Sequence, residues 1–309
     1  MKEYPSIEAG LYEVQGRRET MEDTHVMFED LKAVLDAVPD HTAFFGVYDG
    51  HGGVDAAKLC RDYLHRKIVE APEFRLGRIE DAIRVGFRET DELIVMKSNE
   101  NQWMNGSTGV ILLLMERRLY VANVGDSEAS LVELNDNGEM DYTILTKIHR
   151  ASDPKEKMRI ESLGGHVFFN RVFGSLAVSR SFGDSRFKVP KTSQNFVSCE
   201  PSIGQFELTT RSRYLVIACD GLWDVMSHYE VAKFVQNRHL EGRGATQIAT
   251  DLVEEALKKK TEDNVTVLVV ILNWDHEETS TGSIEEKIPD AQPHDDVLDS
   301  SSVMEESKA

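Results

Sequence analysis

Residues 43–53 read AFFGVYDGHGG, an apolar run of strand length that leads into an aspartate flanked by a tyrosine and a glycine. Two further segments repeat the arrangement. The apolar run 214–219 leads into Asp220-Gly221, and Asp263-Asn264 stands directly before the apolar run 265–272. Such short runs, rich in β-branched and aromatic residues, are typical of buried strands. The sequence therefore predicts three buried strands, each with a carboxylate at one end.

The remaining pattern predicts hairpins and helices in the same domain. Runs 110–115 and 119–124 are separated by three residues, which favours an antiparallel hairpin. Apolar residues recur at helical spacing in three further segments, residues 54–69, 79–95 and 248–257. Because hairpins stand beside helices without strict alternation of strand and helix, we expect an α+β fold with antiparallel sheets instead of a doubly wound parallel sheet.

Two helix starts are marked by capping residues. Asp153-Pro154 places a capping side chain and an N1 proline before a helix that Gly164-Gly165 should stop. Ser227, with Glu230 three residues later, forms a capping box for a helix that ends near His239.

Composition limits the classes of partner. The chain has 309 residues, of which 40% are hydrophobic and 29% charged, and a net charge of −19 that disfavours nucleic acid and anionic membrane surfaces. Residues 275–309 carry 11 acidic and 2 basic residues, which predicts a disordered acidic tail after one domain at residues 1–274. The longest apolar run is too short to cross a bilayer. We expect a monomer in the cytoplasm or the nucleus, bound to neither nucleic acid nor membrane.

The three strand-end carboxylates are candidates for a metal site. A carboxylate at the rim of an apolar core needs hydrogen bonds, a cation or a metal ion to offset its desolvation. Carboxylate and carbonyl oxygens are the ligands that Mg²⁺ and Mn²⁺ prefer. The alternative is that Asp49-Gly50 and Asp220-Gly221 only form turns, which is the commonest use of Asp-Gly.

A fourth acidic cluster lies near the N-terminus, at residues 18–23, which read RETMED. Arg18 could bind a phosphate dianion through bidentate hydrogen bonds from its guanidinium. Taken alone, the cluster could equally be a group of solvated surface charges.

Seven motifs stand in order along the chain. They are QGRRETMED at 15–23, VYDGHGG at 47–53, GST at 106–108, ANVGDS at 122–127, RVFGSLAVSRSFGD at 171–184, CDGLWD at 219–224 and EDNVT at 262–266. In this order they resemble the motifs of the PPM (PP2C-type) metal-dependent serine/threonine protein phosphatases, and the match spans residues 12–274.

The resemblance implies a four-layer αββα fold, a central sandwich of two antiparallel β-sheets flanked by α-helices. It also implies two Mg²⁺ or Mn²⁺ ions at one end of the sandwich. Carried over by position, Asp49 would bridge the ions, Asp220 and Asp263 would hold one, and Glu22 with the carbonyl of Gly50 would hold the other. The resemblance places Asp23 just behind them, beside the water around the ions.

The activity implied is hydrolysis of phosphoserine and phosphothreonine in phosphorylated proteins by a metal-activated water, with no phosphoenzyme intermediate. Arg18 would hold the phosphoryl oxygens. His51 is the candidate acid for the departing alkoxide, and its alternative role is to orient Asp49. A catalytically weak or inactive pseudophosphatase that acts as a scaffold is the alternative function; the retention of Asp49, Asp220 and Asp263 together favours the enzyme.

Two positions depart from the family pattern. Ile148 stands where family members usually carry an aspartate that helps to bind a weaker third metal ion together with the residue matching Asp224, so we expect that third site to be weakened. Glu128 stands where arginine is usual. Asp126 and Asp184 follow glycines in expected turns, and we assign them to structure.

Overall fold

The protein is described here by a computed structural model that covers residues 4–135, 137–188 and 195–274. These residues belong to one compact unit. The predicted acidic tail lies outside the described residues. No helix among them is long and apolar enough to span a membrane.

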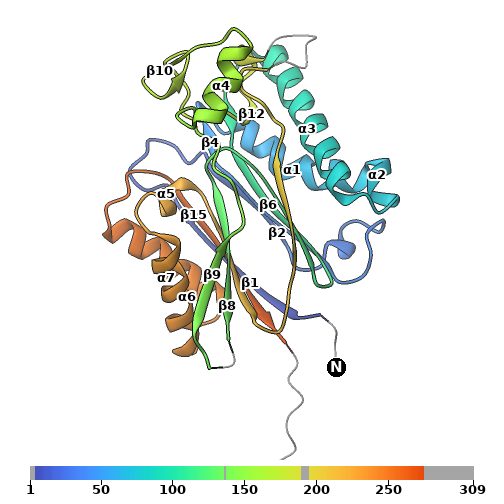
Figure 1. Ribbon diagram of the computed structural model, residues 1–309, viewed down its shortest axis with the longest axis vertical. Coiled ribbons are helices and arrows are strands. Elements are labelled where there is room, and N and C mark those ends of the chain that lie inside the picture. Colours follow the sequence, from blue (N-terminus) through green and yellow to red (C-terminus); the bar gives the residue numbers. More distant parts are fainter. Residues whose placement is uncertain (1–3, 136, 189–194, 275–309) are drawn as a thin grey trace, which may run out of the picture. The chain divides into compact units, whose positions relative to one another are not determined.

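Two five-stranded antiparallel sheets form the centre of the unit (Figure 1). The first has the order β1-β15-β14-β8-β9 and the second the order β13-β7-β6-β3-β2. The strands of the first are β1 (Ser6–Val14), β15 (Val265–Asn273), β14 (Ser212–Ala218), β8 (Glu128–Leu134) and β9 (Met140–Ile144). Those of the second are β13 (Ser202–Glu207), β7 (Arg118–Val124), β6 (Gly109–Met115), β3 (Thr42–Tyr48) and β2 (Thr24–Phe28). The predicted hairpin is β6–β7, where Met115 pairs with Arg118.

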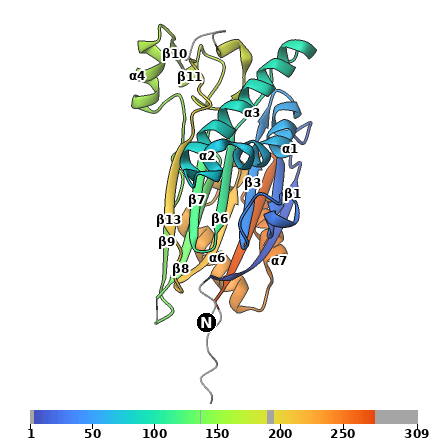
Figure 2. The same cartoon turned by 90° about the vertical axis from the view of Figure 1, so that its right-hand side faces the viewer.

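Helices cover both outer faces of the sandwich, so the predicted αββα architecture is confirmed (Figures 1 and 2). The second sheet is covered by α1 (Asp55–Glu70), α2 (Pro72–Arg75) and α3 (Ile79–Asn101). The first sheet is covered by α6 (His228–Leu240) and α7 (Ala245–Lys258). The remaining short elements are η1 (Leu31–Ala33), β4 (Gly50–His51), β5 (Gly106–Ser107), α4 (Pro154–Ser162), β10 (Val167–Phe168), β11 (Arg171–Val172), β12 (Phe182–Gly183), η2 (Ser185–Phe187) and α5 (Asp220–Trp223).

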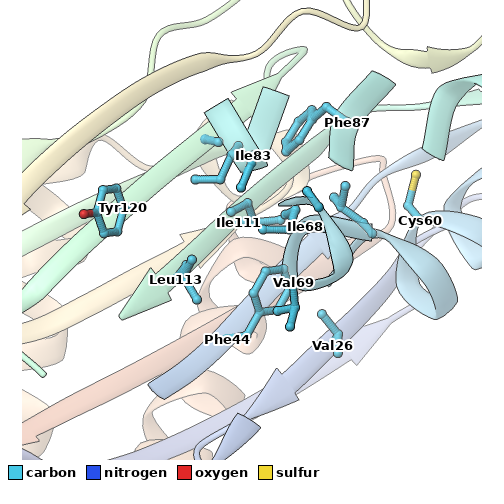
Figure 3. Close-up of a cluster of buried hydrophobic side chains, with 14 of the residues drawn as sticks. Val26, Phe44, Cys60, Ile68, Val69, Ile83, Phe87, Ile111, Leu113 and Tyr120 are labelled. Carbon is cyan, nitrogen blue, oxygen red and sulfur yellow. The ribbon is translucent and has the colours of Figure 1, made fainter. Parts of the chain in front are cut away.

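Alternation along the central strands explains the layers. In β3, Phe44 and Tyr48 point toward the helices, whereas Phe45 and Val47 point into the space between the sheets. Successive side chains of a strand leave from opposite faces, so a strand buried on both sides is apolar throughout. Figure 3 shows Phe44 among side chains that include Ile68 of α1 and Ile83 of α3.

The predicted helix starts are also present. Asp153 accepts hydrogen bonds from the backbone amides of Lys155 and Glu156 at the start of α4. Ser227 and Glu230 form the reciprocal capping box of α6. Both predicted caps are confirmed. Each depends only on contacts within four residues, so the local sequence is enough to predict it.

Candidate metal centre

Segments from both sheets meet where the strand-end aspartates lie. Asp49 follows β3 of the second sheet. Asp220 begins α5, with one residue between it and the end of β14 of the first sheet, and Asp263 precedes β15. Strands β14 and β15 are paired neighbours, with Ala218 opposite Val267. The antiparallel pairing therefore brings the end of β14 and the start of β15 to the same edge of the sheet.

Glycines allow the backbones of these segments to approach each other closely. A Cβ atom on Gly50 would lie 2.5 Å from the carbonyl oxygen of Glu22, and one on Gly221 would lie 2.0 Å from that of Asn264. Neither distance is compatible with a real side chain. The two glycines therefore bring Asp49 to the segment around Glu22, and Asp220 to Asp263.

The pKa values of the carboxylates reflect how close together these groups lie. Burial raises the pKa of Asp49 well above its usual range, and the neighbouring carboxylates of Asp23, Asp220, Asp126 and Asp263 raise it further. The pKa of Asp220 is raised to about 7, first by burial and then by Asp126 and Asp263. Several acidic groups thus share one poorly solvated region that disfavours their charged forms.

Local contacts hold the individual carboxylates. Asp263 accepts hydrogen bonds from Nη2 of Arg18 at 2.7 Å and from the backbone amide of Asn264 at 2.8 Å. Asp23 accepts one from Oγ1 of Thr266 at 2.7 Å. Among the residues that the structure describes, no three His, Cys, Asp or Glu side chains are already grouped closely enough to hold a metal ion.

The donor set nevertheless fits Mg²⁺ or Mn²⁺. It consists of carboxylates and a backbone carbonyl, with no sulfur or imidazole among the predicted ligands, and hard divalent cations prefer such oxygen ligands. Cations would also offset the repulsion among the buried carboxylates. A cavity of about 450 Å³ borders the region and is lined in part by Arg18, Asp220, Asp224 and Asp263.

Asn264 fixes the N-terminal acidic cluster against this region. Its Oδ1 accepts from the amide of Glu22 at 2.8 Å, and its Nδ2 donates to the carbonyl oxygens of Gln15 and Thr20 at 2.8 and 2.9 Å. The side chain is buried. One asparagine therefore holds a segment about 245 residues away in sequence beside the strand-end aspartates.

The model of the protein phosphatase 2C family matches residues 7–265. The chain belongs to the protein phosphatase 2C family. It is 40% identical over 278 residues to "Protein spalten" of Dictyostelium discoideum. That match covers 87% of this chain but only 28% of the length of the relative. It is 36% identical over 282 residues to "Probable protein phosphatase 2C 8" of Arabidopsis thaliana, with 86% of this chain and 78% of that one covered.

A solved structure shares the fold. The "serine-threonine phosphatase 2C from Toxoplasma gondii" superposes with a TM-score of 0.76 at 24% identity, and the match covers 87% of this chain and 96% of that one. The resemblance inferred from the seven motifs is thereby confirmed for the family and for the fold.

In this protein phosphatase 2C chain, His51 contacts Asp184, a residue that is expected from the sequence to serve only in a turn. Nε2 of His51 lies 2.8 Å from Oδ2 of Asp184, and the hydroxyl of Ser181 donates to the same oxygen at 2.6 Å. Asp184 is buried and has a left-handed backbone, with φ of 49°. Its assignment to structure alone is therefore incomplete, because its carboxylate contacts the candidate acid.

The second family departure, Glu128, has a partner of its own. Its Oε2 lies 3.3 Å from Nε2 of His228, and both side chains are largely buried. The ring of His228 stacks on Trp223 of α5, with centroids 4.2 Å apart. Glu128 thus contacts the start of α6, just beyond the Asp220–Asp224 segment, and lies outside the set of predicted metal ligands.

Removal of divalent metal should make the folded chain less stable as the pH rises. Burial and neighbouring carboxylates raise the pKa of Asp220 to about 7, while burial raises that of Asp23 to about 6. The folded chain therefore binds these protons more tightly than the unfolded chain does. The resulting stability is complete below the unfolded pKa of about 3.9 and is lost as the pH rises through 6 and 7.

The variant Asp220→Asn isolates this contribution. In EDTA at pH 7.5, we expect it to be about 2 kcal/mol more stable than the wild type, and at pH 4 to be nearly equal, by urea unfolding. Asp36→Asn, at an exposed carboxylate, is the control and should show no such difference. An equal effect of Asp220→Asn at both pH values would contradict the prediction.

Proposed function

We propose that this chain is a metal-dependent protein serine/threonine phosphatase that hydrolyses phosphoserine and phosphothreonine with water as the nucleophile. The observation that carries the proposal is the convergence of Asp49, Asp220 and Asp263 from two sheets, beside the Arg18 guanidinium. Family membership supports the same reaction class. The chain covers only part of some relatives, so the proposal concerns this domain.

Each group has a chemical task. Mg²⁺ or Mn²⁺, held by Asp49, Asp220, Asp263, Glu22 and the carbonyl of Gly50, would neutralise the phosphate dianion and acidify the attacking water. Two ions per chain are proposed, with Asp23 supporting their hydration from its bond to Thr266.

Arg18 binds the phosphoryl group. Its guanidinium donates to Asp263 and is half-exposed, so it can also face a phosphate entering from solvent. A guanidinium recognises phosphate oxygens through paired donors. Arg18 therefore links substrate binding to the position of Asp263.

His51 completes the reaction by protonating the leaving oxygen. The attacking water gives up one proton to solvent as its oxygen bonds to phosphorus. The bond from phosphorus to the serine or threonine oxygen breaks, and that oxygen receives the proton of His51, which a proton from solvent then replaces. Since Nε2 is engaged by Asp184, Nδ1 is the nitrogen left for the leaving group. The products are the free hydroxyl side chain and inorganic phosphate.

The test is phosphate release from a phosphothreonine peptide, with a phosphotyrosine peptide as the comparison. We expect release with Mn²⁺ or Mg²⁺, none in EDTA, and a preference for phosphothreonine. A folded protein that binds Mn²⁺ but releases no phosphate from either peptide would overturn the proposal in favour of a non-catalytic scaffold.

A further inference from the structure

Arg150 connects two carboxylates at the rim of the acidic region. Its Nε donates to Oδ2 of Asp126 at 3.1 Å, and its Nη2 donates to Oδ1 of Asp224 at 3.0 Å. Asp126 lies in the turn between β7 and β8, and Asp224 follows α5. One guanidinium thus bridges two segments that come from different parts of the chain.

The backbone around Arg150 is fixed on both sides. The amide of His149 donates to the carbonyl oxygen of Gly125 at 2.8 Å, and the amide of Ala151 donates to that of Ala177 at 2.7 Å. The first bond holds the segment against the turn that carries Asp126, and the second holds it against Ala177. The guanidinium is therefore presented from a defined backbone position and not from a free loop.

Charge balance explains why a cation is needed at this place. Asp126 is buried, with a side chain 8% exposed, and burial raises its pKa while Arg150 lowers it. A buried carboxylate without a cationic partner is strongly unfavourable. Asp224 is exposed and would be free to turn toward any cation that Asp126 attracted.

We propose that Arg150 acts as a permanent cation at this rim and excludes a further divalent metal ion from Asp126 and Asp224. The guanidinium cannot lose its proton at physiological pH, and it engages one oxygen of each carboxylate. Ile148, two residues earlier, supplies no oxygen ligand in compensation. The inference rests on the proposed metal-dependent function, because it concerns how many ions the site accepts.

Calorimetric titration with Mn²⁺ tests the inference without measuring turnover. We expect Arg150→Met to bind one ion more than the wild type, with weak affinity, and Asp224→Asn in that background to remove it. Lys147→Met is the matched control, since it makes the same change of charge at an exposed neighbour and should add no ion. Arg150→Lys retains a cation and should behave as the wild type does.

The outcomes separate this inference from the proposed function. When the wild type binds at least one ion, an Arg150→Met variant that binds the same number of ions overturns the inference. If Arg150→Met fails to fold, the variant Ile148→Asp tests the inference instead. It adds an oxygen ligand while Arg150 stays in place, so we expect no additional ion. An additional ion would overturn the inference. Failure of the proposed function would instead appear as no Mn²⁺ binding by any variant.

Discussion

Asp49→Asn is expected to reduce metal-dependent phosphate release by about 10³-fold or more, which corresponds to about 4 kcal/mol of lost transition-state stabilisation. The pKa of Asp49 is raised by four neighbouring carboxylates, those of Asp23, Asp220, Asp126 and Asp263. It also directly precedes Gly50, whose backbone packs against Glu22.

A second measurement on the same variant distinguishes lost chemistry from lost folding. Because burial and like charges disfavour ionised Asp49, the asparagine should make the metal-free protein more stable at neutral pH, by urea unfolding in EDTA. Asp36→Asn should leave both quantities unchanged. Near-normal phosphate release by Asp49→Asn would contradict the assignment of Asp49 as the shared ligand.

Asn264→Ala is expected to destabilise the chain by about 2–4 kcal/mol and to raise the Mn²⁺ concentration needed for activity. The substitution removes three hydrogen bonds and leaves the carbonyls of Gln15 and Thr20 and the amide of Glu22 without their partner. The segment that carries Arg18 and Glu22 would then lose its attachment beside Asp263. Urea unfolding and a Mn²⁺ titration of activity measure the two effects.

Asn101→Ala is the matched control for this prediction. Asn101 also donates a side-chain hydrogen bond, to the carbonyl oxygen of Lys97 at 2.9 Å, but it is exposed at the end of α3. We expect its substitution to cost less than about 1 kcal/mol and to leave the Mn²⁺ requirement unchanged. If Asn264→Ala behaved no differently from Asn101→Ala, the proposed role of Asn264 in fixing the acidic segment would be wrong.

Much of the fold could be predicted because its signals are local. The apolar composition of β3, β6, β14 and β15 reflects burial on both faces, and the caps of α4 and α6 involve residues within four positions. Edge strands carry a weaker sequence signal. The sequence of β9 alternates weakly, and four of its five side chains are exposed, so no apolar run marks it.

The candidate site also has a part that can be predicted from local sequence and a part that cannot. Asp49, Asp220 and Asp263 are marked by the strands beside them, which makes them visible in the sequence. The contacts of Asp184 and Arg150 are not marked, because their partners lie 133 residues away at His51 and 24 and 74 residues away at Asp126 and Asp224. No local pattern encodes contacts made only when the two sheets and their loops pack together.

Anomalous diffraction from crystals of the Mn²⁺-loaded protein measures most directly where divalent ions bind. We predict two manganese peaks that share Asp49, one also contacting Asp220 and Asp263 and the other Glu22 and the carbonyl of Gly50. Well-ordered crystals with no manganese peak at Asp49, or with peaks only elsewhere, would contradict the proposed metal centre.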